Sequence, residues 1–131
     1  MRYPTTLLTF ILVAIFNGGC SAKALTDGDL QGSWKLVKIG SRDVVIDENR
    51  RPRFTISGGN ISGFDGCNRF SGHLDKPGSV VSTRMACLDT AVKLPLAFDD
   101  LLTHLQTGTL QNNLLTLPAW KDLPASEYEH E

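Results

Sequence analysis

Short runs of alternating apolar and polar residues dominate the chain between residues 33 and 83. A period of two is typical of half-buried β-strands. The runs are separated by turn sequences, among them Gly58-Gly59, which tolerates the positive φ of a tight hairpin, and Asp75-Lys76-Pro77-Gly78. These patterns predict strands at residues 33–39, 44–46, 54–56, 61–64, 68–74 and 79–83.

The period changes after residue 93. Apolar residues then recur at spacings of three and four, which predicts one amphipathic helix with Pro95 in its first turn and Gly108 at its end. Residues 110–117 are predicted to be the last strand. The apolar residues of the predicted helix are Leu94, Phe98, Leu101, Leu102 and Leu105.

These elements predict a mainly β fold with one helix (α+β), in which an antiparallel sheet curls into a partly closed barrel around a single amphipathic helix. Residues 20–27 are small and polar and are predicted to form a tether. Residues 121–131 are acidic and contain Pro124, so we expect a disordered tail.

The N-terminus has the order of a secretory signal peptide. Arg2 supplies one positive charge, residues 7–16 are apolar, and Asn17-Gly18-Gly19 follow. The apolar run has about half the ~20 residues that a transmembrane helix requires. Residues 1–19 are therefore predicted to be a signal peptide, and the protein to be exported.

Two cleavage sites compete. Gly18-Gly19-Cys20 resembles the end of a bacterial lipobox, although Asn17 stands where that pattern prefers leucine. Lipidation of Cys20 would anchor the protein to a membrane, and Ser21 is compatible with the outer membrane. Cleavage at Ala22-Lys23-Ala24 would instead give a soluble periplasmic protein. We favour lipidation at Cys20, with the domain facing the periplasm.

The charge and the length of the chain restrict the classes of partner that we expect. Loss of residues 1–19 removes Arg2 and no acid, so the 13 basic residues of the full chain become 12 against 14 acidic ones, a net charge of −2. Because no basic stripe is interleaved with aromatic residues, nucleic acid is not a predicted partner. Roughly 100 residues remain, enough for one small domain, which we expect to be monomeric.

Cys67 and Cys87 have three possible roles. A disulfide that closes a loop of this size stabilises a small exported domain by about 3 kcal/mol. Two reduced, buried cysteines are the alternative. A redox-active pair is disfavoured because CxxC spacing is absent. We predict a structural disulfide.

Metal binding and catalysis have weaker support. Zinc needs three or four ligands, and no CxxC or HxxxH spacing organises the cysteines with His73, His104 and His130. A cysteine hydrolase built on Cys67 and His73 would separate these groups by about 20 Å along a strand. The prediction is a non-enzymatic protein without metal or cofactor.

Four polar residues flank the two cysteines and form a candidate binding rim. They could together bind an anion or a polar ligand. In the alternative interpretation, Asn68 takes a left-handed turn conformation and caps backbone groups while the arginines are solvated. The rim residues are Asn68, Arg69, Thr83 and Arg84.

Three segments resemble the META domain family. Leu30-Gln31-Gly32-Ser33-Trp34-Lys35-Leu36 is similar to its opening LxGxWxL pattern, and GCNRFSG (66–72) and STRMAC (82–87) resemble its two central signatures. The resemblance covers residues 28–117, and we assign residues 28–120 to this domain. It implies an HslJ-type bacterial envelope protein: a small barrel-like domain linked to envelope stress and drug tolerance, with no established catalytic activity.

The expected role is therefore binding or scaffolding in the envelope. Two alternatives stay open. A small-ligand carrier would have an apolar interior pocket. An inhibitor or partner of another envelope protein would use an open sheet edge near residues 110–117, because the pattern is interrupted at residues 118–124 where the family continues into another strand.

Overall fold

The computed structural model describes residues 24–88 and 91–131, so the predicted signal peptide and Cys20 lie outside the described residues. None of the helices in these two ranges is long and apolar enough to cross a membrane. The elements are β1 (Gly32–Ile39), β2 (Arg42–Asp43), the 3-10 turn η1 (Glu48–Arg50), β3 (Arg53–Ser57), β4 (Asn60–Phe64), β5 (Arg69–His73), β6 (Val81–Ser82), α1 (Leu101–Gln106), β7 (Thr109–Gln111), β8 (Leu114–Leu117) and β9 (Ser126–His130).

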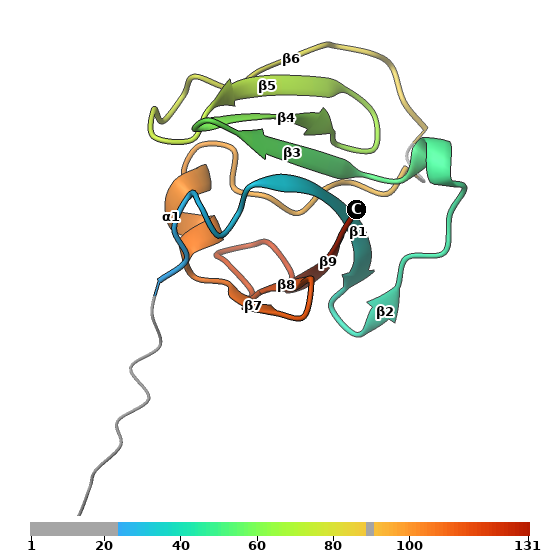
Figure 1. The fold of residues 1–131 in the computed structure, drawn as a ribbon. Coiled ribbons are helices and arrows are strands. Elements are labelled where there is room, and N and C mark those ends of the chain that lie inside the picture. Colours follow the sequence, from blue (N-terminus) through green and yellow to red (C-terminus); the bar gives the residue numbers. More distant parts are fainter. Residues whose placement is uncertain (1–23, 89–90) are drawn as a thin grey trace, which may run out of the picture.

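The strands form one antiparallel sheet in the order β6-β5-β4-β3-β1-β9-β8-β7, with β2 paired to β1 (Figure 1). The predicted antiparallel sheet with one helix is confirmed. Within the described ranges, no pairing joins β6 to β7, so the two edges stay open and a partly closed barrel is not confirmed.

The core lies on the inner face of the strongly twisted sheet. Trp34 and Leu36 alternate with half-buried residues along β1, as the period of two predicts. The Trp34 indole is satisfied because its Nε1–H donates to the Leu30 carbonyl at 2.9 Å. Aromatic and aliphatic side chains from every long strand complete this core: Phe54, Ile56, Ile61, Phe70, Leu115, Leu117 and Tyr128.

The C-terminal segment is ordered, and the prediction of a disordered tail at 121–131 is wrong. β9 lies between β1 and β8, where Tyr128 pairs with Leu36 on one side and Leu115 on the other. Tyr128 is fully buried, its ring meets Phe54 edge-on at 5.2 Å, and burial raises the pKa of its hydroxyl. The sheet is therefore completed after residue 117 by β9, beyond a loop at 118–125.

Residues 110–117 do not form one strand. β7 and β8 are the two arms of a hairpin whose turn is Asn112-Asn113, with φ of 47° and 66°. Asparagine tolerates these angles better than other residues that carry a side chain. β8 is paired on both sides, so the predicted open edge is reduced to the three residues of β7.

The helix is shorter than predicted. It begins at Leu101, whereas Leu94 and Leu96 are buried in a segment without regular secondary structure that leads to it. Leu94 N–H donates to the Asp65 carbonyl at 2.7 Å, which fixes this segment beside the β4–β5 turn. Pro95 favours an extended residue before it, so the apolar spacing of three and four overestimated the helix.

The second strand also differs from the prediction. β2 lies at Arg42–Asp43, and residues 44–46 form a loop in which Val45 is 94% exposed. The Arg51 guanidinium donates to the carbonyls of Leu36 (2.9 Å) and Val44 (3.0 Å). The bond from Arg51 occupies the Val44 carbonyl, which a strand at 44–46 would need for hydrogen bonds to a neighbouring strand.

The His104 side chain of α1 contacts the segment before the helix and the 118–125 loop. It is fully buried, and its Nδ1 accepts a hydrogen bond from Ala97 N–H at 3.1 Å. Its ring lies 5.3 Å from that of Trp120 in the 118–125 loop. Burial lowers the pKa of His104, and the Pro118 backbone and the Asp100 carboxylate oppose this only in part.

The stability of the domain should fall as the pH drops below about 6.5, the pKa of His104 in the unfolded chain. The unfolded state binds the proton more readily, and protonation places a donor opposite Ala97 N–H, so the slope should approach about 1.4 kcal/mol per pH unit at most. Urea unfolding at pH 5 to 8 measures this.

His104→Asn keeps an acceptor near Ala97 and cannot titrate, so its pH profile should be flatter than that of the wild type. The exposed His73→Asn variant serves as the control and should keep the wild-type profile. Parallel profiles for His104→Asn and the wild type would show that His104 is not responsible.

Candidate functional site

The turn before β5 is built by Asp65 and Gly66. The Asp65 carboxylate accepts hydrogen bonds from Cys67 N–H at 2.8 Å and Asn68 N–H at 2.6 Å. Gly66 has φ +105°, and a Cβ there would collide with the Val92 carbonyl. This local geometry explains the Gly66-Cys67-Asn68 sequence and places Cys67 two residues before β5.

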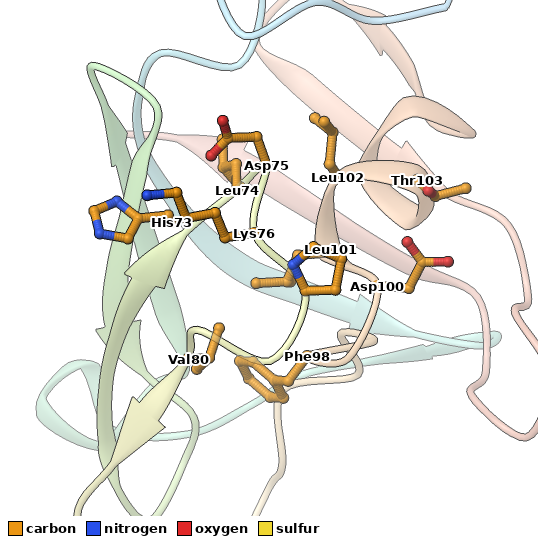
Figure 2. Close-up of a pocket in the computed structure, with 11 residues that line it drawn as sticks. His73, Leu74, Asp75, Lys76, Val80, Phe98, Asp100, Leu101, Leu102 and Thr103 are labelled. Atoms are coloured by element: carbon orange, nitrogen blue, oxygen red, sulfur yellow. The ribbon is translucent and has the colours of Figure 1, made fainter.

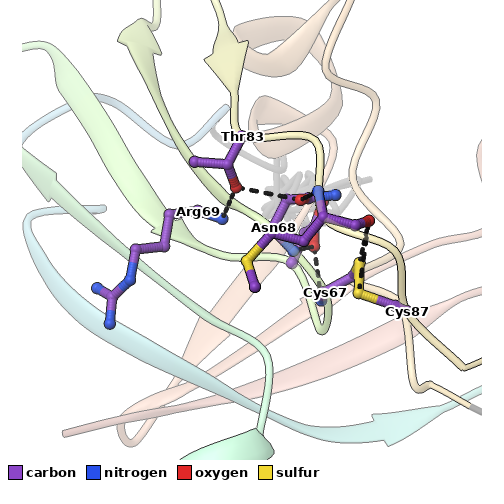
Figure 3. Close-up of a disulfide and its surroundings, with 7 residues drawn as sticks. Cys67, Asn68, Arg69, Thr83 and Cys87 are labelled. Atoms are coloured by element: carbon purple, nitrogen blue, oxygen red, sulfur yellow. Dashed lines mark hydrogen bonds between the residues drawn. A yellow bond between two sulfur atoms is a disulfide. The ribbon is translucent and has the colours of Figure 1, made fainter.

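Cys67 and Cys87 are joined by a disulfide, with their Cα atoms 5.7 Å apart (Figure 3). The predicted disulfide is confirmed, and the alternative of two buried thiols is wrong. Cys67 consequently has no thiol to act as a nucleophile or as a metal ligand. Among the described residues, no group of three or more His, Cys, Asp or Glu side chains is placed to hold a metal ion.

Three of the four predicted rim residues form a hydrogen-bonded framework (Figure 3). Asn68 Oδ1 accepts from Met85 N–H at 2.7 Å and from the Thr83 hydroxyl at 3.1 Å. The Thr83 hydroxyl in turn accepts from Arg69 N–H at 3.1 Å. These oxygens hold the segment after β6 against β5, so they are occupied within the protein.

The backbone-capping interpretation of Asn68 is therefore confirmed, but its predicted left-handed conformation is wrong. In the described residues other than glycine, positive φ occurs at Asn112, Asn113 and Lys121. The side chains of Arg69 and Arg84 are exposed, and no ion pair engages either within the described ranges. Only these two guanidinium groups of the predicted rim remain available to an external ligand.

Sequence reasoning missed the apolar character of this region. Every residue from 81 to 88 is exposed, and the exposed fractions of Val81, Met85 and Leu88 are 67%, 66% and 70%. We call residues 67–70 and 81–88 the β5–β6 surface. Apolar side chains gathered on one exposed, braced segment are typical of an interaction site.

Three hollows share Phe98, and two of them border this surface. One of about 200 Å³ lies between the β5–β6 turn and α1, with Phe98 beside Val80 at one end (Figure 2). A second of about 410 Å³ reaches the disulfide, and a third of about 290 Å³ lies against β6. Phe98 is half-buried and meets Phe70 edge-on at 4.8 Å.

The sheet interior itself is filled. Trp34 and Phe54 are buried together with the leucines of the core, whereas Phe98 is partly buried at its margin. The apolar interior pocket that a small-ligand carrier requires is not found in the part of the chain that the structure describes, and the hollows open on the outside.

One comparison with known proteins gives a match. The model of the META domain family matches residues 24–125, which contain the disulfide, the β5–β6 surface and α1. The match extends beyond residues 28–117, over which the sequence motifs resemble that family. No curated protein and no solved structure matches the chain.

Removal of the disulfide should destabilise the domain without unfolding it. Replacing Cys67 and Cys87 together by serine should lower the free energy of unfolding by about 3 kcal/mol, because the unfolded chain gains the freedom of an open loop. Urea unfolding measures the loss, and reduction of the wild-type protein should reproduce it.

Cys20→Ser is the matched control, since it removes the one cysteine that takes no part in this disulfide and should leave stability unchanged. Amide exchange of Met85 should become faster in the double variant but stay measurable, because the bond to Asn68 Oδ1 remains. Equal stability of the double variant and the wild type would contradict a stabilising role.

Proposed function

We propose that this chain, which belongs to the META domain family, is a non-enzymatic binding or scaffolding module of the bacterial cell envelope. In this proposal it is an HslJ-type lipoprotein, anchored through Cys20 in the outer membrane with its domain facing the periplasm. It binds another envelope component and thereby supports tolerance of envelope stress or drugs.

The supporting observation is the braced apolar segment of the β5–β6 surface. Met85 and Leu88 are exposed, yet a disulfide and the Asn68 hydrogen bonds fix the backbone that carries them. Holding exposed apolar side chains in place lowers the entropy that must be lost on binding. This arrangement suits a binding surface better than a solvated loop.

The N-terminal turn supports an orientation toward the membrane. Leu25 packs against the core, and Thr26 N–H donates to the Asp29 carboxylate at 2.9 Å. The five Cα–Cα steps from Cys20 to Leu25 span at most about 18 Å. A lipid on Cys20 would therefore keep this end of the domain close to the membrane.

The β5–β6 surface lies at the other end of β5. Gln31 accepts from Gly58 N–H at 3.2 Å and the Gly59 carbonyl accepts from Leu74 N–H at 2.9 Å, so the N-terminal turn adjoins the end of β5. Cys67 precedes the start of that strand. The disulfide and the exposed apolar residues would consequently face the periplasm and its proteins.

Replacement of Cys20 by alanine should move the protein from the membrane to the soluble fraction. The lipid would be its membrane attachment, so its loss leaves a soluble domain. Cell fractionation followed by immunoblotting measures this, with Met85→Ala as a variant that should stay in the membrane. Unchanged fractionation of Cys20→Ala would exclude lipidation at this cysteine.

The double variant Met85→Asp, Leu88→Asp should fold normally and fail in the cell. Both side chains are exposed, so stability should change by less than about 0.5 kcal/mol. A deletion strain that carries this variant should survive heat or antibiotic exposure no better than the strain without the gene.

Val45→Asp is the matched control, because Val45 is also an exposed apolar residue but lies in the β2–η1 loop. It should restore survival as the wild type does. Full survival with the Met85, Leu88 variant would exclude the β5–β6 surface from the function.

A further inference from the structure

We propose that the free edge of β6 binds an extended, positively charged segment of a partner protein as an additional β-strand. The inference rests on the binding role proposed above and gives that role a site and a chemical class of partner. It depends on three features: an unpaired strand edge, a groove beside it, and the charge of that groove.

The backbone of β6 is paired on one side. Ser82 is opposite Phe70 and Val81 is opposite Ser71, while Thr83 N–H donates to the Arg69 carbonyl at 2.9 Å. In an antiparallel pair, alternate residues direct their backbone groups to the partner strand. The N–H and C=O of Ser82 therefore point away from β5, toward an edge that no described strand covers.

The residues of β6 at this edge are exposed. β6 forms the outer edge of the sheet in Figure 1, and the chain continues beyond it as an exposed segment to residue 88. The Cys67–Cys87 disulfide and the bond from Met85 N–H to Asn68 keep that segment from folding over the edge. Such edges accept extended peptides, because the backbone bonds are already aligned.

The groove lies where an added strand would place its inward side chains. Val80 and Ser82 line the hollow of about 290 Å³ together with Phe70 and Phe98. Side chains alternate between the two faces of a strand, so every second residue of the added strand would lie over this hollow. The half-buried Phe98 ring offers an apolar floor to one of these residues.

The charge of the groove selects a basic segment. Carboxylates line the three hollows that share Phe98. Within the described ranges, no ion pair and no side-chain hydrogen bond engages the carboxylates of Asp75, Asp99 and Asp100. Two lysines, Lys76 and Lys93, lie among them. The exposed Arg69 and Arg84 lie on the β5–β6 surface but do not line these hollows. The hollow of about 290 Å³ under the added strand is lined by Asp65 and Asp99 and by no lysine or arginine, so lysine or arginine at the inward positions would complement it.

The test uses the full chain purified from cells that export it, with a ten-residue capped peptide of alternating valine and lysine as the probe. A peptide of alternating valine and glutamate has the same length and strand propensity. Fluorescence anisotropy should show tighter binding of the lysine peptide, by about tenfold or more. Amide exchange of Ser82 should become slower when the lysine peptide is bound.

Two variants and one control test the site. Asp99→Lys should lower the affinity for the lysine peptide by about tenfold. Ser82→Pro should abolish binding of this peptide, because it removes the outward N–H that the added strand needs. Asp122→Lys places the same charge change on an exposed residue of the 118–125 loop and should leave affinity within about twofold. Urea unfolding of Ser82→Pro confirms that it is folded.

Several results would overturn the inference. Equal affinity for the two peptides would exclude charge selection, and slower exchange at residues 109–111 would move the site to β7. Protection of Ser82 that grows with protein concentration alone would make a second copy of the chain the occupant. Unchanged affinity in the folded Asp99→Lys and Ser82→Pro variants would exclude the β6 edge.

The failure of this inference is distinct from failure of the proposed function. If the Met85, Leu88 variant loses stress tolerance while neither peptide binds at β6, the binding role stands and the β6 site is wrong. If that variant keeps full tolerance while the lysine peptide protects Ser82, the edge is a peptide site and the proposed cellular function is wrong.

Discussion

The antiparallel pairing of β1 with β9 joins the first and last strands of the chain, and both halves of the sheet depend on it. β1 continues the sheet through β3 to β6, and β9 continues it through β8 to β7. Tyr128 lies opposite Leu36 and against Phe54, so it packs between the two halves. Without β9, β1 would be an edge strand and β7–β8 an isolated hairpin, which is marginally stable at best in water.

A second constraint holds the region that we assign to binding. The Asp65 turn, the disulfide and the Asn68 hydrogen bonds fix a segment whose side chains contribute little to the core. Met85 and Leu88 remain exposed as a result. Polar residues at these positions would serve the stability of the fold equally well, so the apolar character of Met85 and Leu88 supports the binding role that we propose.

Alternation of apolar and polar residues predicted the strands whose inward residues are apolar, which are β1, β3, β4 and β5. It missed β9, because charged residues flank Tyr128 and its other inward positions are Ser126 and His130. It also made the predicted helix too long, because buried residues in the irregular segment before α1 continue the helical spacing of α1. In both cases tertiary contacts, rather than the local pattern, decide the structure.

The candidate site, like the fold, could be predicted in part from the sequence. Two cysteines in an exported chain indicated the disulfide, and a polar residue beside a turn indicated the backbone-capping role of Asn68. The exposure of Met85 and the marginal position of Phe98 depend on how far β6 and the segment before α1 approach each other. No periodicity in the sequence encodes that distance, so the groove emerges only in three dimensions.

The two open edges of the sheet are not equivalent, and this difference decides which one we assign to a partner. β7 is three residues long and is held in a tight hairpin by Asn112-Asn113, and none of the three hollows that share Phe98 borders it. β6 has only two residues, but it continues into an exposed segment that the disulfide secures, and it borders a hollow lined by Phe98 and by the Asp99 carboxylate. An added strand at β6 gains both backbone hydrogen bonds and selective side-chain contacts, whereas β7 offers mainly the former.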